Sequence, residues 1–162
     1  MDTTYEKKLL GIQSFALLCG TIFAWSKLIP QFNHFQSLYG TLFRFSDCTV
    51  PNPLLTACFY GSMAFLGALF WSLSVYKNPG LVSERRLRNF LLFCVIFAAS
   101  VVLYEAAQYY KIFATNAVSV SCSPGVSPLR TPCFFGMLFF IAAFITSIFA
   151  TRRFESVAAV RV

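Results

Sequence analysis

The stretch PLLTACFYG at residues 53–61 recurs as PLRTPCFFG at residues 128–136, an offset of 75 residues. The shared pattern, Pro-Leu-x-Thr-x-Cys-Phe-[Tyr/Phe]-Gly, is too specific to result from common hydrophobicity alone. The same offset aligns further pairs on both sides of the motif: Phe15 with Phe90, Leu17 with Leu92, Cys19 with Cys94, Phe65 with Phe140, Ala68 with Ala143 and Ser72 with Ser147. The sequence therefore predicts two tandem copies of one unit.

Each copy contains two segments long enough to cross a bilayer. Of the 162 residues, 57% are hydrophobic and only 12% are charged, which excludes an ordinary soluble domain. A membrane helix needs about 20 mostly apolar residues. Such segments lie at 9–29, 58–76, 90–109 and 133–150. We expect an all-α, four-helix transmembrane bundle.

The bundle is expected to form a single membrane domain of helix-loop-helix repeats. The domain covers residues 1–162. It consists of repeat 1 at about 9–76, a cytoplasmic connector at 77–88 and repeat 2 at about 88–150. The second helix of each copy carries small residues one turn apart, a pattern that lets membrane helices approach closely. We therefore expect the second and fourth helices to meet along Ala68 and Ser72 and their counterparts Ala143 and Ser147.

Basic residues predict the orientation. Lysine and arginine gather at one end of the predicted bundle: Lys7, Lys8, Lys77, Arg85, Arg86, Arg88, Arg152, Arg153 and Arg161. The positive-inside rule then places both termini in the cytoplasm. Because this topology explains most of the net charge of +7, we expect the lipid bilayer as partner and no nucleic acid. A plasma membrane or bacterial inner membrane is the expected location.

Four of the six cysteines are expected on the outer side of the membrane: Cys48, Cys58, Cys122 and Cys133. Disulfides persist there, and four cysteines allow three pairings. We favour Cys48–Cys58 with Cys122–Cys133, each of which closes a short loop and would add roughly 2–3 kcal/mol of stability. Cross-links between the two copies are the alternative. Cys19 and Cys94, inside the bilayer, are expected to be inert thiols.

Four membrane helices with paired outer cysteines resemble the DsbB-type and vitamin K epoxide reductase-type membrane thiol oxidoreductases. The resemblance implies that Cys48, Cys58, Cys122 and Cys133 exchange disulfides with a thioredoxin-like partner and pass electrons to a quinone. Those families carry a Cys-x-x-Cys beside the quinone, and this sequence has none. Cys58 and Cys133 lie at predicted helix N-termini, where the helix dipole stabilises a thiolate.

Glu105 is the one acidic residue inside a predicted span, near the outer end of the third helix. Carboxylates inside membranes are costly and often functional. With Gln108 one turn further on, Glu105 predicts a proton relay or a quinone-headgroup site. The alternative is an interfacial carboxylate in water or paired with a nearby lysine or arginine. No cluster with metal-ligand spacing occurs, so no metal site is expected.

Two functions from different classes follow. The first is a small membrane thiol-redox protein that acts on the outer face. The second is a non-enzymatic accessory or structural subunit of a larger membrane complex, with structural disulfides. Transport is a third possibility, although the spans contain almost no charge and no broken helix. We expect a working site where 53–61 and 128–136 face each other.

Overall fold

The computed structural model describes residues 3–41, 52–112 and 127–160. Four long helices form within these ranges: α1 Thr3–Tyr39, α2 Ala57–Lys77, α3 Leu81–Tyr109 and α4 Pro132–Val160. Two short 3-10 helices, η1 Pro53–Leu55 and η2 Pro128–Arg130, precede α2 and α4. All four long helices are apolar enough and long enough to cross a membrane. This confirms the predicted all-α class with four helices that are long and apolar enough to span a membrane.

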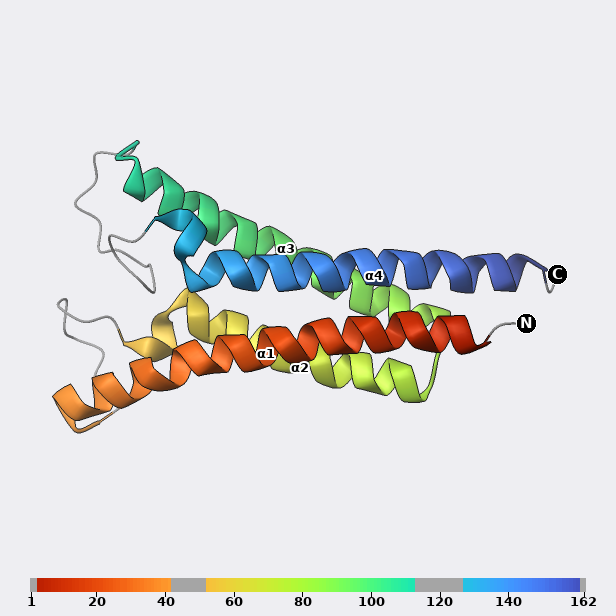
Figure 1. Cartoon of the computed structure of the whole chain (residues 1–162), viewed down its shortest axis with the longest axis horizontal. Coiled ribbons are helices and arrows are strands. Elements are labelled where there is room, and N and C mark those ends of the chain that lie inside the picture. The colour runs from red at the N-terminus through yellow and green to blue at the C-terminus, as the bar shows by residue number, and fades with distance from the viewer. Residues whose placement is uncertain (1–2, 42–51, 113–126, 161–162) are drawn as a thin grey trace.

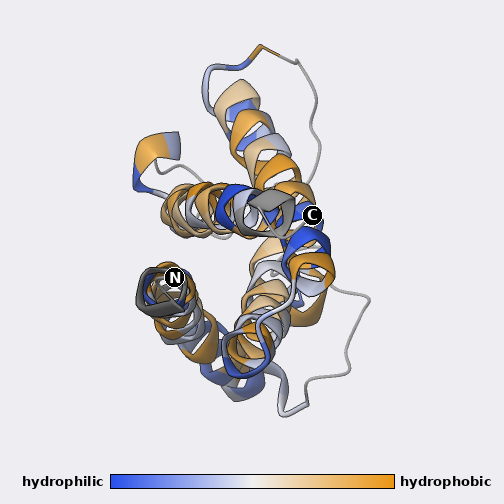
Figure 2. Ribbon diagram, turned by 90° about the vertical axis from the view of Figure 1, so that its right-hand side faces the viewer, coloured by the Kyte–Doolittle hydropathy of each residue, from blue (hydrophilic) through white to orange (hydrophobic). Residues whose placement is uncertain are grey.

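The helices lie side by side in an elongated bundle, with both chain ends at one end and η1 and η2 toward the other (Figure 1). α1 packs against α2 and α4, and α3 packs against α4, whereas α2 and α3 touch along a shorter stretch. In the view along the bundle, hydrophobic residues make up much of the ribbon (Figure 2). Large apolar side chains such as Phe15, Phe70 and Leu103 are exposed on the outside of the bundle, where lipid solvates them.

α1 runs through Pro30 to Tyr39 instead of ending before the proline. Proline removes one helix hydrogen bond, so packing must stabilise the extra turns. Phe35 is 2% exposed, and its ring centroid lies 4.8 Å from the ring centroid of Tyr39. The Phe32 ring contacts Phe59 of α2 at 6.2 Å. The loop predicted to follow the first span is therefore helical in its first part.

α3 also begins earlier than predicted, at Leu81, so most of the connector expected at 77–88 is helical. The arginines in this stretch suggested a polar connector. Glu84 and Leu87 are nevertheless fully buried, while Arg85 is exposed and bonds to Glu155 of α4 at 2.7 Å. The segment is an amphipathic first part of the helix.

Phe65 of α2 and Phe140 of α4 stack in the core of the bundle. Their ring centroids are 3.8 Å apart, with planes inclined by 8°, and both side chains are buried. Gly20 of α1 faces Phe65 so closely that any Cβ there would collide with the ring. Glycine is therefore required at residue 20 for α1 to approach this stack.

The small-residue faces do not join α2 to α4 as expected. The Oγ atoms of Ser72 and Ser14 of α1 are 2.8 Å apart, and Ser147 donates a 2.5 Å hydrogen bond to Glu84 of α3. Each serine thus ties its helix to the helix that precedes it in sequence. A buried hydroxyl needs a partner inside an apolar bundle, and α1 and α3 provide one.

Candidate functional site

The two copies of the sequence motif build the same local structure. The Thr56 hydroxyl donates to the Pro53 carbonyl at 2.7 Å and accepts a 3.4 Å hydrogen bond from the Phe59 N–H. Thr131 makes the same two contacts one copy later, at 2.9 Å to Pro128 and 3.4 Å from the Phe134 N–H. Both threonines are the predicted caps, and each fixes the cysteine two residues further on at a helix N-terminus.

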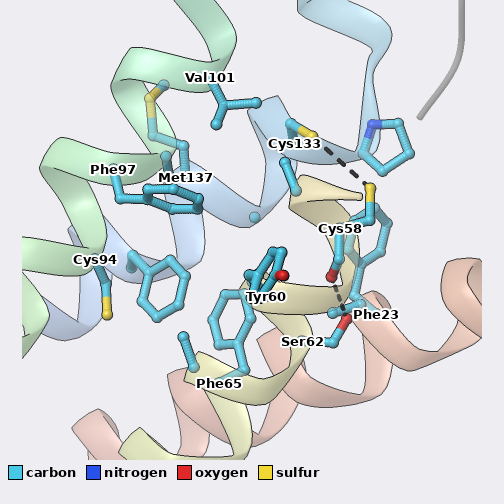
Figure 3. Close-up of a pocket in the computed structure, with 18 of the residues that line it drawn as sticks. Phe23, Cys58, Tyr60, Ser62, Phe65, Cys94, Phe97, Val101, Cys133 and Met137 are labelled. Atoms are coloured by element: carbon cyan, nitrogen blue, oxygen red, sulfur yellow. Dashed lines mark hydrogen bonds between the residues drawn. The ribbon is translucent and has the colours of Figure 1, made fainter. Parts of the chain in front are cut away.

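These caps bring two cysteines together. The sulfur atoms of Cys58 and Cys133 are 3.9 Å apart, and they face each other at one end of a cavity (Figure 3). Cys58 is disulfide-bonded, whereas Cys133 carries a thiol. The second half thus differs from the expectation of one disulfide in each copy. Cys48 and Cys122 lie outside the described residues, so the predicted Cys48–Cys58 pairing stays a prediction.

Among the residues that the structure describes, Glu105 of α3 is the carboxylate at this end of the bundle. It is 6% exposed and lies near Cys133. Gln108, the other residue expected to bind a cofactor, donates instead to the Tyr104 hydroxyl at 3.0 Å on the exposed side of α3. The structure therefore places Glu105 near Cys133, and neither Glu105 nor Gln108 lines the cavity.

The cavity beside the sulfurs has a volume of about 450 Å³ and is lined by all four helices. Phe65 and Phe140 form part of its wall together with other aromatic residues. Two of these, Tyr60 of α2 and Phe93 of α3, are 52% and 65% exposed, so the cavity reaches the bundle surface between α2 and α3. Of the described residues in the lining, Lys27 is the one cation, and its ammonium lies 5.8 Å from the Phe23 ring centroid.

The aromatic lining was not identified from the sequence, because phenylalanine is common throughout the chain and most of it is expected to pack or face lipid. A signal was nevertheless present. Phe65 and Phe140 share the offset that relates Cys58 to Cys133, and both pairs meet between α2 and α4. Residues related by the 75-residue offset are therefore candidates for contact between α2 and α4.

Cys94 also lines the cavity, on the side away from the sulfur pair (Figure 3). It is 3% exposed and carries a thiol, as does Cys19 of α1. Within the described ranges, no group of three or more histidine, cysteine or acidic residues could hold a metal ion.

A second buried polar cluster lies nearer the chain ends and was missed, because the third helix was expected to start after it. Glu84 is fully buried and accepts a hydrogen bond from Ser147. Gln13 of α1 is fully buried near this carboxylate. The cluster joins α1, α3 and α4.

Replacing Glu84 with alanine is expected to lower the free energy of unfolding by roughly 1–3 kcal/mol, because Ser147 loses its buried acceptor. Glu155→Ala is the matched control. It removes a carboxylate whose ion pair with Arg85 is half-exposed, at 45% and 53%, and should cost less than about 1 kcal/mol. Loss of helical circular dichroism in mixed micelles of increasing SDS content compares the two. Equal costs would contradict a structural role for Glu84.

No family model matches the chain, and neither a curated protein nor a solved structure matches it at a significant level.

Proposed function

We propose that this integral membrane protein is a thiol oxidoreductase that exchanges disulfides at the outer membrane surface and passes the electrons to a lipid-soluble quinone. The observation that carries the proposal is the 3.9 Å approach of the Cys58 and Cys133 sulfurs at one end of an aromatic cavity. A thiol beside a disulfide sulfur is the arrangement that exchange requires.

The cavity fits a hydrophobic, ring-shaped molecule. Its volume of about 450 Å³ lies in the range of small-molecule sites. Aromatic walls favour a flat ring by stacking, and the opening between α2 and α3 allows an apolar tail to extend into lipid. Lys27 supplies a positive charge near the site. When bound, a quinone accepts two electrons and two protons, which the cysteines provide.

The proposed exchange uses three sulfurs. We take Cys48 as the disulfide partner of Cys58. An external dithiol reduces this disulfide and leaves as a disulfide itself, so that Cys48 and Cys58 become thiols. Cys58 and Cys133 then lose two electrons and two protons to the quinone and form a disulfide with each other. Attack by the Cys48 thiolate on Cys58 restores the first disulfide and releases Cys133 as a thiol.

The starting state of this cycle has Cys58 in a disulfide and Cys133 as a thiol, which is the arrangement of the described cysteines. The absence of a Cys-x-x-Cys is then no obstacle, because the pair next to the cavity is assembled from two helices. Cys122 has no assigned role in the cycle. The external dithiol belongs to a protein of the thioredoxin-like class.

We further propose that the two halves are copies of one unit related by a twofold axis along the membrane normal, with both termini in the cytoplasm. The identical caps at Thr56 and Thr131 support the duplication. The location of both chain ends at one end of the bundle supports a shared side. The concentration of basic residues at that end favours the cytoplasmic side.

The test is quinone reduction by the purified protein in lipid nanodiscs, followed by the ultraviolet absorbance of ubiquinone-1 or menadione with a reduced thioredoxin-like protein as donor. The proposal predicts reduction that depends on both donor and protein. If neither quinone is reduced above the rate with empty nanodiscs, the accessory-subunit alternative is favoured instead.

A further inference from the structure

The second buried polar cluster contains a carboxylate, Glu84, whose charge is only partly balanced. Its Oε1 atom accepts a 2.5 Å hydrogen bond from Ser147, whereas its Oε2 atom has no hydrogen-bond partner among the described residues. Within the described ranges Glu84 forms no ion pair, and the neighbouring Arg85 is bonded to Glu155 on the surface. Glu84 lies in the first turn of α3, where the helix dipole supplies only about half of one positive charge.

The polar groups of this cluster point into one part of the core. Gln13, Glu84 and Ser147 are each 0% exposed. Residues three or four positions apart lie on the same face of a helix. The neighbours at this spacing belong to a single hydrophobic core cluster: Leu10 and Leu17 beside Gln13, Leu87 beside Glu84, and Ala143 and Ala150 beside Ser147. Three helices therefore direct polar side chains toward the same buried region.

Gln13 adds two further polar atoms without partners. Its amide oxygen and its amide nitrogen are both buried and form no hydrogen bond with any described residue. Native proteins pair nearly all buried polar side-chain atoms, and each exception calls for an explanation such as a bound water or ion. Gln13 lies near the Glu84 carboxylate. The unpaired oxygens of these two residues are therefore suited to share one positively charged ligand.

We infer that Glu84, Gln13 and Ser147 form a binding site for one monovalent cation inside the bundle. A single positive charge neutralises the one carboxylate, whereas a divalent ion would leave an excess charge in the core, which is costly. The ligands are carboxylate, amide and hydroxyl oxygens, which suit hard cations and do not suit soft metals. None of the three residues lines the aromatic cavity, so the site is separate from the proposed quinone chemistry and does not depend on it.

Two kinds of cation share this chemistry. A proton on Oε2 of Glu84 would be donated to the amide oxygen of Gln13, so that one hydrogen bond satisfies both unpaired oxygens. An alkali ion, Na⁺ or K⁺, would be held by the same two oxygens and the hydroxyl oxygen of Ser147. Either cation joins α1, α3 and α4 and binds the folded bundle only. Both should therefore stabilise the protein by mass action.

The other charged groups around the site are almost all basic. Among the side chains that the structure describes on the surrounding turns, Glu155 is acidic and exposed, and the remainder are Lys7, Lys8, Lys77, Arg85, Arg86, Arg88, Arg152 and Arg153. All of these are exposed except Arg88, which is half-buried. Lysine and arginine stay charged between pH 5 and pH 8. A response in this range that depends on Glu84 therefore reports the carboxylate.

The test is the melting temperature of the full chain in dodecyl maltoside micelles, followed by circular dichroism. In one series at pH 8, N-methyl-D-glucamine chloride is replaced stepwise by NaCl or KCl at constant ionic strength. In a second series without alkali ions, the pH is lowered from 8 to 5. A saturating rise in the first series identifies an alkali ion as the ligand. A rise in the second series alone identifies a proton, which infrared absorption of a protonated carboxyl group checks directly.

Variants decide whether the response comes from this site. Glu84→Gln should abolish it in either series, because a neutral amide needs no counter-charge while its oxygen can still accept from Ser147. Glu155→Gln removes an exposed carboxylate and should keep the response. Gln13→Leu should require about tenfold more of the cation, equivalent to 1.4 kcal/mol of binding.

The inference is overturned if the wild-type protein responds in neither series or if Glu84→Gln keeps the wild-type response. If Glu84→Gln does not fold, Gln13→Leu takes its place, and an unshifted response in that variant overturns the inference. Glu84 would then serve only as the hydrogen-bond partner of Ser147. Quinone reduction is not measured in this experiment, so its outcome leaves the oxidoreductase proposal untouched.

Discussion

Cys133→Ser is expected to lower dithiol-driven quinone reduction by on the order of 10³-fold or more, as loss of a reacting nucleophile does in other enzymes. Serine keeps the size and polarity of the side chain, and the Thr131 cap at the start of α4 does not depend on the sulfur. The bundle should therefore stay folded. A serine oxygen cannot form a disulfide with Cys58, so no electrons can leave through this pair.

The measurement is the initial rate of quinone bleaching in nanodiscs, with Cys19→Ser as the matched control. Cys19 is also a thiol inside the bundle but does not line the cavity, so its replacement should change the rate by less than about twofold. A Cys133→Ser protein that reduces quinone at the wild-type rate would show that the sulfur pair takes no part in the reaction.

Gly61→Leu is expected to raise the KM for quinone by about tenfold or more, equivalent to 1.4 kcal/mol of lost binding. Gly61 lines the cavity, and a Cβ added there meets no atom within 4 Å. A leucine side chain can therefore enter the cavity without displacing the protein. It would occupy volume that the quinone needs, while the sulfurs and Glu105 remain in place.

Gly67 of α2 provides a close control. A Cβ at this residue also meets nothing within 4 Å, but Gly67 does not line the cavity. Both substitutions replace a helical glycine by a good helix former, with a similar gain of up to about 1 kcal/mol in helix propensity. Only Gly61→Leu should change the KM, while alkylation of Cys133 should stay unchanged in both. The same KM in both variants would exclude this cavity as the quinone site.

The sequence predicted the existence of the helices better than their ends. Hydrophobic length alone identifies segments that must cross a membrane, because no other structure satisfies the backbone there. The helix ends depend on packing. α1 continues through Pro30 because Phe35 is buried by its neighbours, and α3 starts early because Glu84 and Leu87 find places in the core. Neither contact is encoded in local hydropathy.

Part of the site could be predicted from the repeat itself, because matching residues of the two copies have the same spacing. The conserved spacing between the copies pointed to the two loop-to-helix junctions, and the sulfurs of Cys58 and Cys133 do meet there. Glu105 was identified by its position inside a span. The cavity could not be predicted, because its walls come from four separate helices, and nothing in the sequence separates these phenylalanines from those that face lipid.

The most direct test of the account is the mapping of disulfides by mass spectrometry at graded redox potentials, with quinone present. The account predicts that a Cys58–Cys133 disulfide forms during turnover and that Cys58 exchanges partners at potentials typical of thiol oxidoreductases. A purely structural disulfide resists reduction to below about −300 mV. If Cys58 keeps a single partner down to that potential and is never joined to Cys133, the account is wrong and the cysteines serve only to hold the loops.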